Sequence, residues 1–185
     1  MTSIIDRFKK IQLNISALKS EQSVNVIAVS KTFTFEFIKP LIDYGHLHFG
    51  ENKVQEALSK WLDFKKDHTN LKLHMIGKLQ SNKAKDAVKL FDYIHSVDNQ
   101  KLADNLAKYQ KNLNKNLNYF IQVNIGNEIQ KSGIPVQELD AFYNYCVNEI
   151  AKLHLHWTDC DCLVRFDEMI SDFFAQPHIT WPDWI

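Results

Sequence analysis

Residues 24–31 have the sequence VNVIAVSK, a short β-branched apolar run that ends in a serine and a lysine. Such a run is typical of a β-strand that is covered on both faces. The next segment, 34–45, has apolar residues at helical spacing and ends in Gly45. Glycine is a common residue just past the end of a helix. These residues therefore predict a strand followed by a helix.

The same alternation continues along the chain. Strand candidates begin near residues 24, 46, 71, 93, 118 and 153, and the helical patterns between them cover 52–65, 81–90, 99–116 and 135–152. Before the first strand, residues 1–20 have the spacing of an amphipathic helix. Strands that alternate with helices in this way are expected to form repeated βα units and a parallel sheet.

The number of units suggests the fold class. We expect an α/β protein of the (β/α)8 TIM-barrel type that is incomplete, with about six of the eight units that a closed barrel needs. A doubly wound open sheet is the alternative, but no glycine-rich dinucleotide loop follows the first strand. No linker rich in Gly, Pro or Ser divides the chain, so residues 1–185 are predicted to form one C-terminally incomplete domain.

The composition excludes several classes of protein. Of 185 residues, 45% are hydrophobic and 24% charged, and the formal net charge is zero. A neutral chain has no general attraction to nucleic acid or to a membrane surface. No apolar run is long enough for a membrane span or a signal-peptide core. The cysteines, an odd number clustered late in the chain, form no disulfide framework. We therefore expect a cytoplasmic protein.

Polar residues gather directly after five successive strand candidates. In a β/α barrel the functional site forms at the carboxyl ends of the strands, so these positions predict a site. The residues are Ser30, Lys31 and Thr32; Gly50, Glu51 and Asn52; Gly77, Lys78, Gln80, Ser81, Asn82 and Lys83; Ser96 and Asp98; and Asn124 with the turn 131–133.

Among these residues, Lys31 has a side chain that can act as a nucleophile. An amine at the mouth of a buried strand is partly desolvated, which disfavours its charged form. A neutral lysine is a nucleophile and can form a Schiff base with an aldehyde. The alternative is a lysine whose aliphatic stem is buried while its amine extends into solvent. The position of Lys31 alone leaves both open.

Five groups of motif residues follow one another along the chain: AVSKT (28–32), FGENKVQEA (49–57), HMIGKLQSNK (74–83), HSVD (95–98), and QVNI (122–125) with KSGI (131–134). In their order and spacing they resemble the YggS/PROSC family, the pyridoxal phosphate homeostasis proteins. The resemblance covers about residues 1–152. It is specific because the second and third motifs occur together.

The resemblance implies a barrel like the alanine racemase N-terminal domain, with pyridoxal 5′-phosphate as the cofactor and small-molecule partner. Lys31 would hold the cofactor as a Schiff base, and Lys131 would be a second amine nearby. The remaining cofactor-binding positions would be Asn52, Ile76, Gly77, Ser81, Asn82 and Asn124. The family implies a non-catalytic carrier without metal. Two alternatives stay open: an enzyme such as an amino acid racemase, which would need a second catalytic domain, and a decayed fragment that binds no cofactor.

After about Leu155 the family pattern breaks, and residues 153–185 form a divergent tail. The resemblance places the loops that grip the cofactor phosphate in this part. A truncation or a frameshift near residue 156 would account for the change, since codons for 156–162 can encode Ile-Gly-Leu-Ile-Ala-Ile in the next frame. His154, His156, Cys160 and Cys162 offer a metal-binding alternative, although their spacing is unusual for zinc. The family implies a monomer, but a barrel without its last strands should be weakly stable and prone to self-association.

Overall fold

The computed structural model describes residues 3–17, 24–126 and 130–150. Five strands form one parallel sheet, in which each strand pairs with the next along the chain. In order across the sheet they are β1 (Ala28–Val29), β2 (His48–Glu51), β3 (Lys72–Met75), β4 (Tyr93–Val97) and β5 (Asn118–Ile121). The repeated βα units that the sequence predicts are confirmed.

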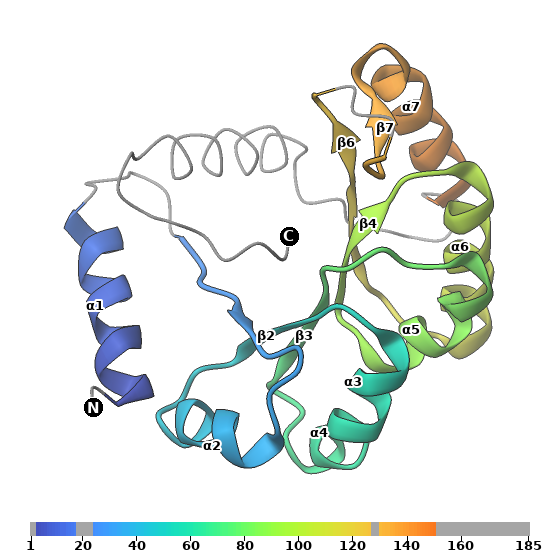
Figure 1. The fold of residues 1–185 in the computed structure, drawn as a ribbon. Helices are drawn as coiled ribbons and strands as arrows, with labels where there is room; N and C mark the ends of the chain where they lie inside the picture. Colours follow the sequence, from blue (N-terminus) through green and yellow to red (C-terminus); the bar gives the residue numbers. More distant parts are fainter. Residues whose placement is uncertain (1–2, 18–23, 127–129, 151–185) are drawn as a thin grey trace.

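Helices connect the strands and lie on the outer side of the arc that the sheet describes (Figure 1). The predicted N-terminal helix is confirmed as the first of them. The helices are α1 (Ile4–Ala17), α2 (Phe35–Asp43), α3 (Val54–Trp61), α4 (Phe64–Asp67), α5 (Ala84–Leu90), α6 (Gln100–Leu113) and α7 (Leu139–Ile150), with short 3-10 turns η1 (Ser81–Lys83) and η2 (Val136–Glu138).

The chain changes sheets after β5. The expected strand over 118–125 is interrupted at Gln122, whose N–H donates to Val97 O at 2.9 Å and whose carbonyl accepts from Ile134 N at 2.8 Å. Beyond it, β6 (Val123–Asn124) pairs in parallel with β7 (Ile134–Pro135) in a second small sheet. The described strands do not close a barrel. The sixth predicted strand, near residue 153, lies outside the described residues.

The first strand differs from its prediction. We expected residues 24–30 to form a strand covered on both faces, but β1 is two residues long and Val29 is 45% exposed. Within the described part of the chain, β1 pairs on one side only, with β2. β-Branched composition indicates strand propensity, but the length of a strand depends on the partners available for its backbone.

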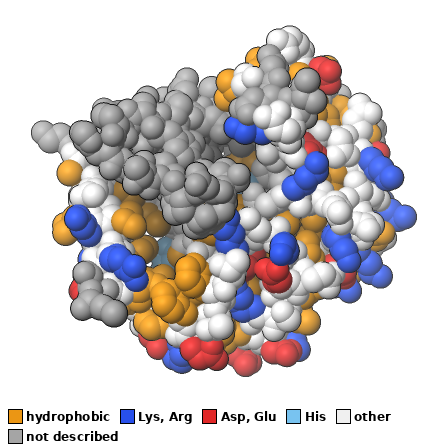
Figure 2. Space-filling view, in the orientation of Figure 1, with side chains coloured by type: hydrophobic (Ala, Val, Ile, Leu, Met, Phe, Trp, Pro, Cys, Tyr) orange, Lys and Arg blue, Asp and Glu red, His pale blue; other side chains and the backbone are white. Residues whose placement is uncertain are grey.

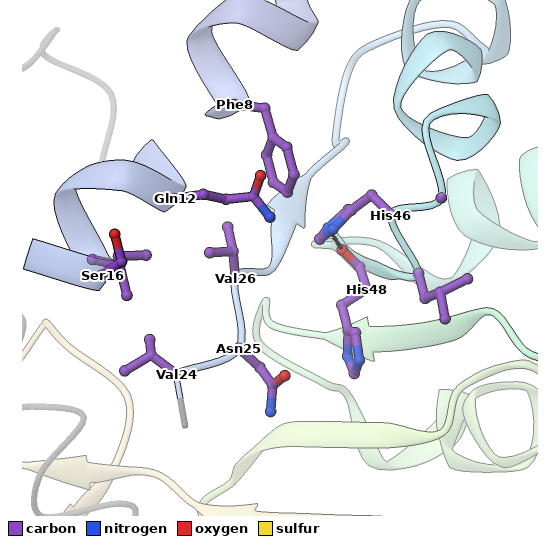
Figure 3. A pocket seen from close by; sticks show the side chains of 11 residues that line it. Phe8, Gln12, Ser16, Val24, Asn25, Val26, His46 and His48 are labelled. Atoms are coloured by element: carbon purple, nitrogen blue, oxygen red, sulfur yellow. Dashed lines mark hydrogen bonds between the residues drawn. The ribbon is translucent and has the colours of Figure 1, made fainter. Parts of the chain in front are cut away.

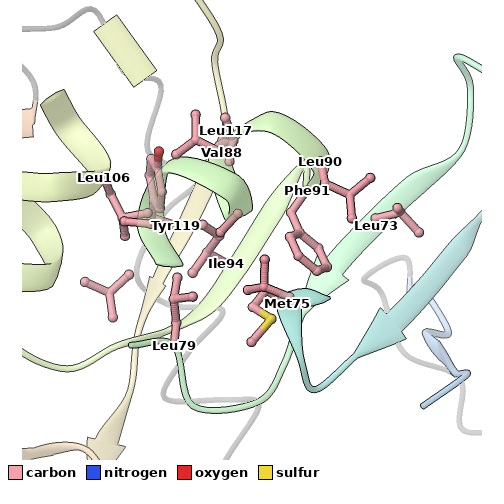
Figure 4. Close-up of a cluster of buried hydrophobic side chains, with 14 of the residues drawn as sticks. Leu73, Met75, Leu79, Val88, Leu90, Phe91, Ile94, Leu106, Leu117 and Tyr119 are labelled. Atoms are coloured by element: carbon pink, nitrogen blue, oxygen red, sulfur yellow. The ribbon is translucent and has the colours of Figure 1, made fainter. Parts of the chain in front are cut away.

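The core lies between the sheet and the outer helices. Alternate strand residues point into it, because successive side chains of a strand face opposite sides. Trp61 of α3 is fully buried and packs on Phe49 of β2, with ring centroids 5.1 Å apart. A second part of the core is shown in Figure 4, where Leu73, Met75 and Ile94 meet side chains from α5 and α6.

Gly45 stops α2 as predicted, whereas α6, predicted over 99–116, ends at Leu113. Gly45 has φ +97° and its N–H donates to Ile42 O, while the next N–H, of His46, donates to Leu41 O. This pair of bonds is a Schellman motif, which satisfies the last carbonyls of α2. α6 is capped at its start by Asn99, whose side chain accepts from Leu102 N at 2.9 Å, and is followed by Asn114 in the left-handed region. Local signals therefore fix these boundaries.

The surface agrees with a neutral chain. On the face in Figure 2, basic and acidic side chains are interspersed over the helical layer. Within the described ranges, none of the helices has the length and apolar character that crossing a bilayer requires.

The cap of α6 gives a first prediction. Asn99→Ala removes the acceptor for Leu102 N and should lower the free energy of unfolding by about 1 kcal/mol. Asn112→Ala, at an exposed position of the same helix, is the control. It should not lower the free energy of unfolding, since alanine has the higher helix propensity. Urea unfolding followed by circular dichroism measures both. Equal effects of the two substitutions would contradict the cap assignment.

Candidate functional site

Lys31 lies in a tight turn that follows β1. The turn is closed by a hydrogen bond from Phe33 N to Ser30 O at 3.2 Å. Thr32, the residue after Lys31, has φ +65°. A β-branched residue is rare in this left-handed region because its side chain crowds the backbone. The turn is therefore held in a strained conformation next to the candidate lysine.

A cavity of about 350 Å³ lies at this turn. Its lining comes from the carboxyl ends of β1 and β2 and from the first turn of α3, and consists of Lys31, Thr32, Asn52, Lys53 and Glu56. Lys53 and Glu56 form an ion pair at 2.8 Å on the rim. The volume is at the small end of the range for small-molecule sites. The structure thus brings together two predicted site residues, Lys31 and Asn52.

The loop after β3 packs against the same corner. Ile76 N donates to Glu51 O at 3.0 Å, which extends the pairing of β3 with β2. At Gly77, an added Cβ would lie 2.4 Å from the carbonyl oxygen of Asn52, so only glycine fits there without a shift of the backbone. This close approach fixes the position of Asn52. Ile76 and Gly77 therefore lie against the corner that contains Asn52, although neither of them lines the cavity.

Four other predicted residues are not among those that line this cavity. Ser81 begins η1, and its carbonyl accepts from Asn105 at 3.4 Å. Asn82 is exposed in the same turn. Asn124 lies in β6 with its backbone against Gly133, and Lys131 is exposed in the turn before β7. These residues also follow strands, at the carboxyl ends of β3 and β5.

Glu51 has a role that the sequence did not reveal. Its side chain is fully buried at the end of β2, on the face that packs against α3. Its Oε1 accepts hydrogen bonds from Ser30 Oγ at 2.8 Å, Lys60 Nζ at 2.8 Å and Trp61 Nε1 at 2.9 Å. The position of this glutamate at the end of a strand predicted a polar loop. The structure instead shows a buried ion pair between Glu51 and Lys60, next to the Lys31 turn.

A row of histidines on the inner face of the sheet was also missed. His48, His74 and His95 lie on β2, β3 and β4, and each Nδ1–Nε2 contact along the row is 3.0 Å. For neutral rings this pattern requires the proton on the same nitrogen throughout. Tyr93 stacks on His74 and Phe120 on His95. A histidine on each of three successive strands was the available signal.

Burial keeps this row neutral. It lowers the pKa of His74 to about 3, with help from the charges of neighbouring imidazoles, and it lowers the pKa of His95 to about 4. Burial also lowers the pKa of His46 and of His48. A buried imidazole is poorly solvated when charged, so its neutral form is favoured. The imidazoles of this row are therefore in their neutral form at pH 7.

A larger cavity, of about 500 Å³, lies at the other end of the strands (Figure 3). It is bounded by α1, by the segment before β1 and by the segment that leads into β2, with Phe8, Val26 and His46 among its lining. Open parallel sheets bind ligands at the carboxyl ends of their strands. The smaller cavity beside Lys31 is therefore the candidate site.

The fold and a lysine at this strand end define a class, the alanine racemase N-terminal domain, whose family model matches residues 7–161. The pyridoxal phosphate homeostasis protein of Escherichia coli K12 is 36% identical over 161 residues, covering 84% of this chain and 68% of the relative. That of Pasteurella multocida is 39% identical over 142 residues. The chain belongs to this family of pyridoxal phosphate homeostasis proteins.

Solved structures agree with this assignment. PipY of Synechococcus elongatus PCC7942 with PLP bound is 36% identical and superposes with a TM-score of 0.61, covering 73% of this chain and 63% of PipY. The alignment with the Pasteurella relative covers 74% of this chain and 61% of that protein. The chain thus spans less than two thirds of both proteins. The four tail residues considered as metal ligands, at 154, 156, 160 and 162, lie outside the described residues.

The histidine row predicts acid sensitivity. An unfolded histidine has a pKa near 6.5, whereas the folded values are about 3 and 4 for His74 and His95. Between pH 6.5 and 4 the unfolded chain therefore binds more protons. The free energy of unfolding should fall as the pH falls, by about 1.4 kcal/mol per pH unit for each imidazole.

Urea unfolding across this pH range, monitored by circular dichroism, measures the effect. Carboxyl groups titrate in the same range, so the informative quantity is the difference from His95→Phe, whose ring can stack on Phe120 in place of the imidazole. The variant should lose less stability per pH unit than the native chain. Identical slopes would show that His95 is not held neutral.

Proposed function

We propose that this chain is a non-catalytic carrier of pyridoxal 5′-phosphate that binds the cofactor through Lys31. The main support is the position of Lys31 at a small-molecule-sized cavity with Asn52, at the carboxyl ends of β1 and β2. A relative of the same fold, PipY, has PLP bound. The homeostasis proteins of Escherichia coli and Pasteurella multocida support a role in handling the cofactor.

The residues present fit this ligand. When bound, pyridoxal phosphate would supply an aldehyde with which a lysine amine can condense, with loss of water. Lys31 provides the amine, which must lose a proton before it attacks. The cavity lining has two lysines against one glutamate.

The other predicted positions belong to the proposal. Asn52, Ile76 and Gly77 would shape the wall beside Lys31, and Ser81 and Asn82 would contribute from the loop after β3. Asn124 and Lys131 would approach from the carboxyl end of β5. The phosphate loops that the family resemblance places in 153–185 lie outside the described residues.

We prefer a carrier to a racemase because the relatives from Escherichia coli and Pasteurella multocida are pyridoxal phosphate homeostasis proteins. We place the protein in the cytoplasm, because Cys146 is a free, buried thiol and the cysteine pattern suits a reducing compartment.

The test is capture of the cofactor by the purified chain. Incubation with pyridoxal phosphate should produce a yellow absorbance band, and borohydride reduction should fix the label on one lysine, which peptide mapping locates. Lys31→Ala should abolish the band and the label. Lys111→Ala, at an exposed position of α6, is the matched control and should behave as the native chain does.

Three results would contradict the proposal. Equal labelling of surface lysines in the native chain and in Lys31→Ala would indicate a fragment without a cofactor site. Labelling at a single different lysine would remove Lys31 from its role. Racemisation of alanine by the native chain, lost in Lys31→Ala, would establish an enzyme instead of a carrier.

A further inference from the structure

The turn that carries Lys31 is anchored by the buried ion pair of Glu51 and Lys60. Lys60 Nζ donates to Glu51 Oε1 at 2.8 Å and also to the backbone oxygen of Ser30 at 2.7 Å. Ser30 Oγ donates to the same carboxylate oxygen at 2.8 Å. The lysine side chain is 13% exposed and the glutamate fully buried. The ion pair thus hydrogen-bonds to both the side chain and the backbone of Ser30, the residue before Lys31.

Ser30 is fixed on every polar atom it has. Its N–H donates to Gly50 O at 2.9 Å, and its carbonyl accepts from Phe33 N as well as from Lys60. Its hydroxyl is held by Glu51. The neighbouring Thr32 keeps a left-handed backbone that costs free energy. A turn with this strain persists only where its surroundings hold it.

We infer that Glu51, Lys60 and Ser30 are positioning residues that hold the Lys31 turn so that the lysine amine meets the cofactor aldehyde. This inference rests on the proposed function and extends it. None of the three lines the cavity. They act on the ligand through the backbone of Lys31, and a held lysine loses less freedom when it binds.

The variants are chosen so that the chain still folds. Removal of one charge would leave the other buried and unpaired, so Glu51→Gln and Lys60→Met are combined, which removes the ion pair and the bond to Ser30 O together. Ser30→Ala removes the hydroxyl and leaves both charges in place. Both variants should remain folded while the Lys31 turn loses its anchor.

Each variant has a matched control. Lys65 of α4 and Asp92, the residue before β4, form a second partly buried ion pair within the described chain, so Lys65→Met with Asp92→Asn controls for loss of an ion pair. Ser59→Ala removes an exposed hydroxyl of α3 that bonds to Glu56 O at 2.9 Å. Neither control touches the Lys31 turn.

Two measurements test the inference. In the ligand-free chain, hydrogen exchange of the Phe33 amide should be faster in Glu51→Gln/Lys60→Met and in Ser30→Ala than in their controls. Pyridoxal phosphate should bind these two variants about three- to tenfold more weakly, the loss expected when one mobile lysine must be ordered on binding. The pH profile of labelling at Lys31 should also shift, since the surroundings of its amine change.

The outcomes separate the two ideas. If the native chain is labelled at Lys31 and both variants match their controls in exchange, affinity and pH profile, the positioning role is wrong and the proposed function stands. If the variants lose thermal stability alone, with labelling at Lys31 unchanged, the ion pair is only structural and the inference is overturned. If the native chain is not labelled at Lys31, the proposed function fails and the inference fails with it.

Discussion

The carboxylate of Glu51 is the constraint on which this corner of the molecule depends. Taking a carboxylate and an ammonium out of water costs several kcal/mol for each ion, and loss of one partner of such a pair costs about 3–5 kcal/mol. One oxygen of Glu51 receives donors from Ser30, the residue after β1, and from α3, and Glu51 itself belongs to β2. These three elements therefore cannot move independently without uncovering a charge. The cavity beside Lys31 lies where the same three elements meet.

The two faces of the sheet differ in the side chains that they present. The outer face packs apolar side chains against the helices, so hydrophobic burial holds the layers together. The inner face carries the row of imidazoles, of which His74 is buried and His48 and His95 are partly buried, and desolvation favours their neutral form while each ring hydrogen-bonds to the next. Ile76 continues the inner face above His74, with Cδ1 against Gly50. The loop that lies against Asn52 is thus supported by the row of neutral imidazoles, which adds no charge near the cavity.

Sequence reasoning succeeded where the signal is local. β4 occupies the predicted residues 93–97, and α6 begins directly after Asn99, within one residue of its predicted start. The proximity of Lys31 and Asn52 followed from the rule that carboxyl ends of parallel strands share one edge. The predicted length of β1 was wrong because amino-acid composition does not show which strands are available to pair with it. Glu51 and the histidines were missed because their partners lie 9 to 26 residues away, and one residue does not reveal which face of a strand it occupies.

The strain at Thr32 connects stability with binding. A single residue in an unfavourable backbone conformation costs about 1–3 kcal/mol, and the chain keeps it although a turn of this kind would accept glycine. Relaxation of Thr32 would turn Lys31 and pull Ser30 from Glu51, so the buried ion pair opposes it. Lys31 is therefore placed before any ligand arrives, and binding does not have to order the turn. A site prepared in this way needs few contacts for the proposed binding of an aldehyde, and within the described part of the chain the cavity of about 350 Å³ has five lining residues.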